Sequence, residues 1–100
     1  MEKSSKYYLL SDIQKHLLHI KKLRFTSMVH KDLVVLNLDL SDVHFVIQHL
    51  KPEHFYKSMT TYHDHRLWQD VYHYPYQGKM LYIKIMAHED SYLIVSFKEK

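Results

Sequence analysis

The chain has 100 residues, of which 46% are hydrophobic and 25% charged, a composition typical of a globular protein rather than of a disordered one. It contains no cysteine, which excludes disulfide bonds, a thiolate nucleophile and sulfur-ligated zinc sites. The formal net charge of +3 permits a polyanionic partner without requiring one. No apolar run approaches the ~20 residues of a membrane span, so we expect a cytoplasmic protein with no membrane contact. The length predicts a single domain, residues 1–100.

The first half of this domain, residues 1–52, is predicted to be mainly helical. The segment Ser11-Asp12-Ile13-Gln14 has the pattern of a capping box, and the apolar spacing after it predicts an amphipathic helix over residues 12–22. A second helix is expected to begin at Thr26 or Ser27, although two adjacent β-branched valines later in it do not favour a helix.

A third helix is predicted over residues 42–50, where apolar side chains recur at helical spacing. Ser41 is its expected N-cap, and Pro52 is expected to end it. In the second helix, Met28 is expected on the apolar face. These assignments predict three helices before the chain changes character.

The second half, residues 55–100, is predicted to form mainly antiparallel strands, because the apolar pattern changes to a period of two. The predicted strands are 67–72, 81–86 and 93–97, with Met59–Tyr62 as a fourth candidate. Gln77-Gly78 and Glu89-Asp90-Ser91 lie between the last three strands, which is the spacing of consecutive hairpins. The fold class is therefore predicted as α+β, with N-terminal helices packed on a C-terminal antiparallel sheet.

Alternation along these strands predicts which side chains face the helices and which face outward. The residues expected to point inward are Leu81, Ile83, Ile85, Leu93, Val95 and Phe97. The residues expected on the outer side of the last two strands are Tyr82, Lys84, Tyr92, Ile94, Ser96 and Lys98. Gln69 and Val71 share one side of their own strand. The polar residues that one sheet face could gather in this way are Lys57, Gln69, Tyr82 and Lys98.

Lysines interleaved with aromatic rings suit a single-stranded nucleic acid, because lysine neutralises phosphate and rings stack on bases. An ordinary solvated face of an antiparallel sheet has a similar composition, and the pattern does not choose between RNA and DNA. The ten histidines suggest metal binding, above all His63 and His65 beside Asp64. Nothing else completes such a site, so no metal or other cofactor is expected.

Three segments of the second half, Phe55–Tyr62, Trp68–Tyr72 and Leu93–Lys100, together with Asp64-His65, closely resemble the MqsR family. These proteins are the motility quorum-sensing regulator toxins of bacterial type II toxin–antitoxin systems. Residues 1–50 agree with the family more in helical pattern and caps than in identity. The resemblance implies a RelE-like α+β fold and a metal-independent, ribosome-independent endoribonuclease that cuts mRNA at short GC-containing sites.

The resemblance also implies a partner, a separate zinc-containing, DNA-binding antitoxin, and contact with DNA only through that antitoxin. The family's functional residues match Lys57, Gln69, Tyr82 and Lys98 of this sequence.

Elementary chemistry suggests roles for these four residues. The two lysines would stabilise negative charge, the glutamine would orient a phosphate or base, and the tyrosine would transfer a proton. A tyrosine with a pKa near 10 is a poor base at neutral pH unless a neighbouring lysine lowers its pKa. His88 and His65 therefore stay open as additional catalytic residues.

Two alternatives come from other functional classes. A non-catalytic RNA-binding module, or an inactive toxin relic, would bind RNA and leave it intact. A histidine-based metal protein would carry stoichiometric zinc or nickel and would be sensitive to chelators. Neither alternative explains the long motif match.

Overall fold

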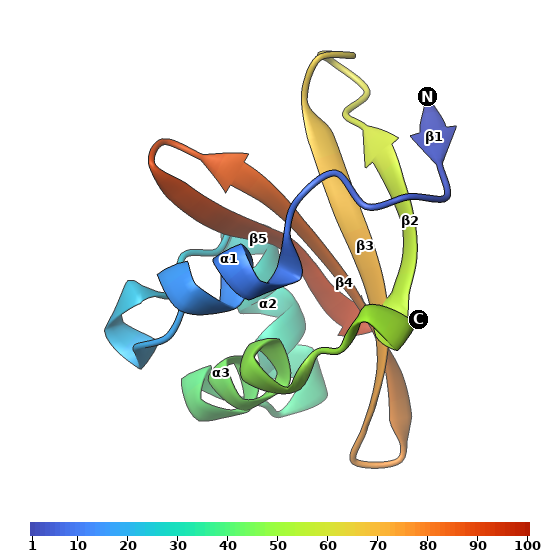
Figure 1. Ribbon diagram of the computed structural model, residues 1–100. Helices are drawn as coiled ribbons and strands as arrows, with labels where there is room; N and C mark the ends of the chain where they lie inside the picture. The colour runs from blue at the N-terminus through green and yellow to red at the C-terminus, as the bar shows by residue number, and fades with distance from the viewer.

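The computed structural model describes residues 1–100 and has helices on one side of a sheet (Figure 1). The five-stranded antiparallel sheet has the strand order β1-β2-β3-β4-β5. This arrangement confirms the predicted α+β fold, with helices in the N-terminal half and most strands in the C-terminal half. In chain order, the elements are β1 (Glu2–Lys3), α1 (Leu10–His16), η1 (Ile20–Lys22), α2 (Ser27–Leu36), α3 (Leu40–His49), η2 (Pro52–His54), β2 (Phe55–Thr60), β3 (Trp68–Tyr76), β4 (Lys79–His88) and β5 (Ser91–Glu99).

The first helix is shorter than predicted. The single helix expected over residues 12–22 is wrong, because α1 ends at His16 and a separate 3-10 helix, η1, follows it. Leu18 and Ile20, which supplied part of the helical spacing, are 52% and 40% exposed. The apolar spacing continues in the sequence beyond the point where the helix leaves the core, so spacing alone did not locate the end of α1.

The capping box predicted for Ser11–Gln14 does not form. Leu9 occupies the N-cap position of α1 and makes no side-chain hydrogen bond. Gln14 Nε2 instead donates to the carbonyl oxygens of Ile47 (3.1 Å) and Leu50 (2.9 Å) at the end of α3. Carbonyls in the last turn of a helix have no partner within that helix, so this contact joins α1 to α3.

The second helix begins where the sequence predicts. Thr26 is the N-cap of α2, and its Oγ1 accepts a hydrogen bond from the Val29 amide at 3.3 Å. Met28 was expected on the apolar face but is 59% exposed, whereas Val29 and Leu33 are buried. Asn37 ends the helix with a φ of 57°, in the left-handed region that asparagine tolerates.

The third helix begins earlier than predicted, because Asp39 rather than Ser41 is its N-cap. The Asp39 carboxylate accepts hydrogen bonds from the amides of Ser41 (3.0 Å) and Asp42 (3.2 Å), and Asp42 Oδ2 accepts one from the Asp39 amide (2.9 Å). This reciprocal arrangement is a capping box. The helix ends before Pro52, as predicted, and Pro52 begins η2.

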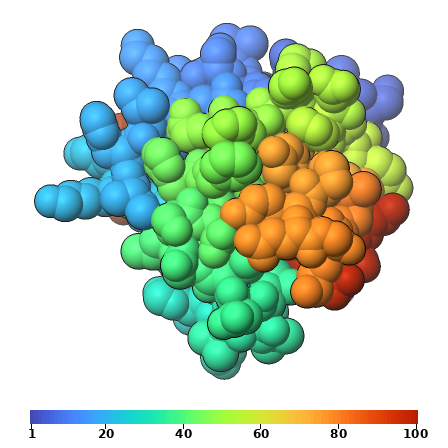
Figure 2. All heavy atoms as spheres, turned by 90° about the horizontal axis from the view of Figure 1, so that it is seen from below, coloured from blue at the N-terminus to red at the C-terminus, as the bar shows by residue number.

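The β3–β4 and β4–β5 hairpins form at the predicted turns. Gln77 and Gly78 both have positive φ values, 51° and 78°, as a tight two-residue hairpin turn requires. The tip of this hairpin lies against α3 (Figure 2), where Tyr76 donates a 2.6 Å hydrogen bond to Asp42 Oδ1. The fourth candidate strand, Met59–Tyr62, overlaps only the end of β2, and β1 was not predicted.

The inward face of β4 is as predicted, but that of β5 is not. Leu81, Ile83 and Ile85 are fully buried, whereas the buried residues of β5 are Tyr92, Ile94 and Phe97 rather than Leu93, Val95 and Phe97. The cause is a β-bulge: Lys84 pairs with Ser96 and Ile85 with Ile94, so Val95 is an extra residue in the ladder. The bulge changes which face the side chains before it occupy, and Phe97 stays inside.

Replacing Phe97 by alanine should destabilise the protein by about 3–5 kcal/mol, because the ring is fully buried in the core. The matched control is Val95→Ala at the half-buried bulge, which should cost roughly 1 kcal/mol or less. Chemical denaturation of the two variants measures both costs. Equal losses would show that Phe97 does not carry the core contact described here.

Candidate active site

The sheet face opposite the helices gathers polar side chains from four neighbouring strands. One row of cross-strand partners runs from β2 to β5. In this row Lys57 pairs with Val71, Val71 with Lys84, and Lys84 with Ser96. Val71 is fully buried although it lies outside the main core cluster, as expected when side chains on the same face cover it. The next row pairs His73, Tyr82 and Lys98.

Tyr82 lies at the centre of this group. The ammonium groups of Lys84 and Lys98 are 5.7 and 5.6 Å from the centroid of its ring. Partial burial raises the pKa of the Tyr82 hydroxyl, and the opposing effect of nearby Lys57 is smaller. Tyr82 is therefore protonated at neutral pH, and its hydroxyl is suited to donating a proton or hydrogen bond rather than to acting as a base.

The lysines differ in their environments. Lys57 Nζ forms a 2.7 Å ion pair with Glu2 Oε2, and this hydrogen bond raises the pKa of Lys57. Burial lowers the pKa of Lys84, and the charges of Lys98 and Lys57 lower it further. The positive charges of Lys57, Lys84 and Lys98 lie close together on this face, so binding of an anion here would be electrostatically favourable.

Asp70 fixes the segment that carries Glu2. Its buried carboxylate accepts hydrogen bonds from the amides of Tyr7 (3.1 Å) and Tyr8 (2.9 Å) and from Ser58 Oγ (2.6 Å). These contacts hold the N-terminal segment against β2 and β3, and β1 then pairs with β2. The partner of Lys57 is thus positioned by a buried contact.

Gln69 lies on the same face, one ladder row beyond Val71. Its Nε2 has a single weak contact, 3.6 Å from the sulfur of Met86. An amide with so weak a partner can still bind a ligand through both its oxygen and its nitrogen. The face therefore carries Lys57, Gln69, Tyr82 and Lys98 together.

His73 is a member of this group that the sequence analysis did not single out. Its ring stacks on Tyr56 with centroids 4.3 Å apart and lies 5.8 Å from the ring of Tyr82. Nε2 is buried without a hydrogen-bond partner, and burial together with the charges of Lys100 and Lys57 lowers the pKa of the imidazole. The alternation that turns Gln69 and Val71 outward also turns His73 outward. The position of His73 on this face could therefore have been predicted from the sequence.

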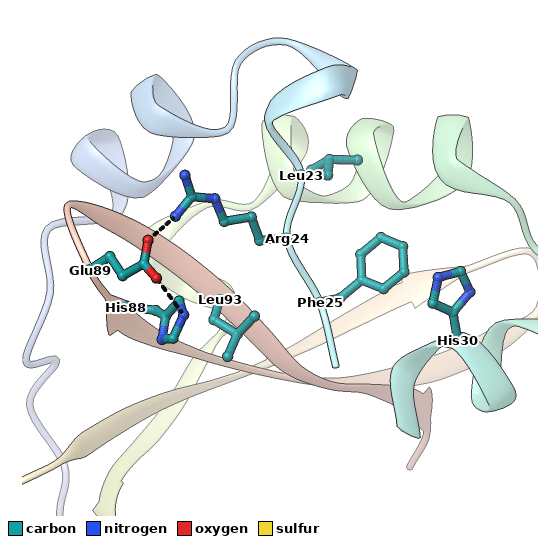
Figure 3. A pocket seen from close by; sticks show the side chains of 7 residues that line it. All are labelled: Leu23, Arg24, Phe25, His30, His88, Glu89 and Leu93. Atoms are coloured by element: carbon teal, nitrogen blue, oxygen red, sulfur yellow. Dashed lines mark hydrogen bonds and ion pairs between the residues drawn. The ribbon is translucent and has the colours of Figure 1, made fainter. Parts of the chain in front are cut away.

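The two other histidines considered from the sequence lie elsewhere. His65 is exposed on the connection between β2 and β3. His88 is at the end of β4, six residues from Tyr82, or about 20 Å along an extended strand. It lines a separate pocket beside Glu89 (Figure 3). The structure brings neither histidine to the face around Tyr82.

The histidines do not assemble into a metal-binding cluster. No group of three or more His, Asp or Glu side chains lies close enough together to hold a metal ion. Asp64, considered with His63 and His65 for that purpose, forms a 3.0 Å ion pair with Arg66.

The chemistry available on the face follows from these environments. Three lysines can stabilise negative charge, a protonated tyrosine can donate a proton, and a histidine held in its neutral form can accept one. These are the groups that the cleavage of a phosphodiester by an internal hydroxyl requires.

Comparison with known proteins gives two matches. The model of the family described as "Motility quorum-sensing regulator, toxin of MqsA" matches residues 5–99. The chain is 42% identical over the full length of both sequences to the mRNA interferase toxin MqsR of Escherichia coli (strain K12).

Proposed function

Because the chain belongs to the motility quorum-sensing regulator family of toxins, endoribonucleases of toxin–antitoxin systems, we propose that it cleaves mRNA at the sheet face around Tyr82. The observation that carries this proposal is the clustering of Lys57, Lys84 and Lys98 on the face that also holds Tyr82 and His73. Cleavage there would prevent translation of the mRNA and stop growth.

The proposed reaction begins with attack of a ribose 2′-oxygen on the adjacent phosphorus. His73, which is neutral at pH 7, accepts the proton of the 2′-hydroxyl. Lys57 and Lys98 neutralise the charge of the phosphorane, with Lys84 beside them. The bond from phosphorus to the 5′-oxygen then breaks, and Tyr82 donates a proton to that oxygen. The products are a 2′,3′-cyclic phosphate and a 5′-hydroxyl.

Gln69 has a different role in this proposal. Its amide lies one row away from the cations and would orient a phosphate oxygen or a base edge, because it offers both a donor and an acceptor. Short GC-containing sequences are the proposed cleavage sites. No ribosome and no metal ion are required, because the lysines themselves supply the positive charge near the phosphate.

An antitoxin partner follows from membership of the toxin family. We propose that this partner is a zinc-containing, DNA-binding protein, so that the toxin contacts DNA only through it. The proposed place of action is the cytoplasm, where mRNA is found. None of the helices has the length and the apolar composition of a membrane-spanning segment.

The purified protein should cleave single-stranded RNA in the presence of EDTA and leave the corresponding DNA intact, since DNA lacks the 2′-hydroxyl. Analysis of the product ends should give a 2′,3′-cyclic phosphate, or its hydrolysis product, and a 5′-hydroxyl. Products with a 5′-phosphate, activity that EDTA abolishes, or RNA that is bound but not cut would contradict the proposal.

Tyr82→Phe should lower the cleavage rate by roughly 100-fold or more, because it removes the hydroxyl of the proposed proton donor and keeps the ring. The melting temperature should change little, and RNA binding should persist. Tyr56→Phe, which removes a hydroxyl from a neighbouring ring, is the matched control and should keep most of the activity. Full activity of Tyr82→Phe would remove Tyr82 from the mechanism.

His73→Phe should also lower the rate by roughly 100-fold or more, because the ring can still stack on Tyr56 but no longer accepts a proton. In the wild type, the rate should rise with pH as His73 loses its proton, with the midpoint below pH 6.5 because the pKa of His73 is lowered. The charged and titratable groups around it are Tyr56 and Lys57 on β2, Tyr82 on β4 and Lys100 at the C-terminus.

A pH–rate profile of both proteins measures this effect, and the acidic limb should disappear in the variant. The control is His49→Phe, since His49 stacks on Phe45 in α3 away from this face. An unchanged acidic limb in His73→Phe would assign the proton acceptor to another group.

A further inference from the structure

A pocket lies at the β5 edge of the sheet, beyond the candidate active site. The segment after η1 runs alongside β5: the Ile94 amide donates to the Arg24 carbonyl (2.9 Å), and the Thr26 amide donates to the Ile94 carbonyl (3.3 Å). Phe25 and Ile94 form a parallel bridge between these hydrogen bonds. The pocket has a volume of about 440 Å³ and is lined by Leu23, Arg24, Phe25, His30, His88, Glu89 and Leu93.

The lining has an apolar and aromatic part and a charged part (Figure 3). Phe25 and His30 meet edge to face with ring centroids 4.8 Å apart. On the other side, Arg24 Nη1 lies 3.5 Å from Glu89 Oε2, and His88 Nε2 lies 3.6 Å from Glu89 Oε1. These ion pairs are long and solvent-exposed, so the guanidinium can exchange Glu89 for a phosphate at little cost.

Side chains of the outer sheet face connect this pocket with the proposed active site. Gln69 Nε2 contacts the sulfur of Met86, and Met86 pairs with Leu93, which lines the pocket. Gln69 on β3 and Leu93 on β5 are two strand spacings apart, roughly 10 Å. A single-stranded chain bound at Gln69 can therefore reach the pocket with a neighbouring nucleotide.

The surface around the pocket carries more basic than acidic side chains, the acidic ones being Glu89 and Asp90. Between Ile13 and Lys31 the sequence contains no aspartate or glutamate. The exposed basic side chains of that stretch are Lys15, His16, His19, Lys21, Lys22, Arg24, His30 and Lys31. A second hollow beside the pocket is lined by polar side chains alone, and these are His16, Lys22, Arg24, Asp90 and Ser91. This charge favours the continuing phosphate backbone of a bound nucleic acid.

We propose that the pocket at the β5 edge binds a nucleotide of the RNA that flanks the cleaved bond. The base lies against Phe25 and Leu93, and Arg24 binds a backbone phosphate. The wall of aromatic and aliphatic side chains with one cation at the rim suits single-stranded RNA, in which bases are free to stack. This inference rests on the proposed function, because it extends the path of the same RNA strand.

The test compares two RNA substrates with the same cleavage sequence, a short one without flanking nucleotides and a longer one with single-stranded flanks on both sides. Arg24→Ala should raise KM for the longer RNA by about tenfold and leave kcat unchanged. The kinetics of the short RNA should stay unchanged. The salt dependence of binding to the longer RNA should also weaken, since one phosphate contact is lost.

The matched control is Arg66→Ala, which removes the same charge from another exposed ion pair. It should leave the kinetics of both RNAs unchanged, and both variants should keep the wild-type melting temperature. If Arg24→Ala leaves the longer RNA unaffected, or impairs both RNAs equally, the pocket does not bind a flanking nucleotide.

Failure of the proposed function would give a different result, because the wild type would then cleave neither RNA. In that case, fluorescence anisotropy with the two labelled RNAs still tests the pocket. The pocket predicts that Arg24→Ala lowers the affinity for the longer RNA alone. Equal affinities of wild type and variant for the longer RNA would overturn the inference.

Discussion

The one-residue bulge at Val95 allows β5 to place both Ile94 and Phe97 in the core while Lys98 lies on the opposite face of the sheet. Ile94 points into the core, so strict alternation after it would turn Ser96 and Lys98 toward the helices and Phe97 outward. With the bulge, Phe97 is fully buried opposite Ile83, and Lys98 pairs with Tyr82 on the other face. The packing of the core and the assembly of the site therefore depend on the same irregularity in the ladder.

The proposed active site combines like charges with few compensating anions. Lys84 is half-buried, and the charges of Lys98 and Lys57 disfavour its protonated form. Glu2 forms an ion pair with Lys57 alone. A bound phosphate would reduce the repulsion between the lysines. This stabilisation would increase as negative charge develops on the phosphate during cleavage. Burial, together with the charges of Lys100 and Lys57, lowers the pKa of His73 and keeps it neutral, as a proton acceptor must be.

The sequence predicted local features better than those that depend on distant contacts. Alternation in β4 correctly placed Ile83 and Ile85 in the core, and Thr26 was correctly expected to begin a helix. The capping box predicted at Ser11–Gln14 does not form, because Gln14 binds carbonyls at the end of α3, which no local pattern reveals. The bulge was missed for a similar reason. Its position depends on the pairing of β5 with β4.

The site shows the same division between local and distant information. Periodicity grouped residues on a face, and only the resemblance to a family gave that face a function. Alternation along β3 places His73 on the same face, and pairing with the neighbouring strand β4 brings it beside Tyr82. The central claim, that this face binds RNA, is tested most directly by NMR chemical-shift mapping with an RNA that lacks the 2′-hydroxyl at the cleaved nucleotide. We predict shifts at Lys57, Tyr82 and Lys98. Shifts confined to α2 and α3, with none on this face, would contradict the account.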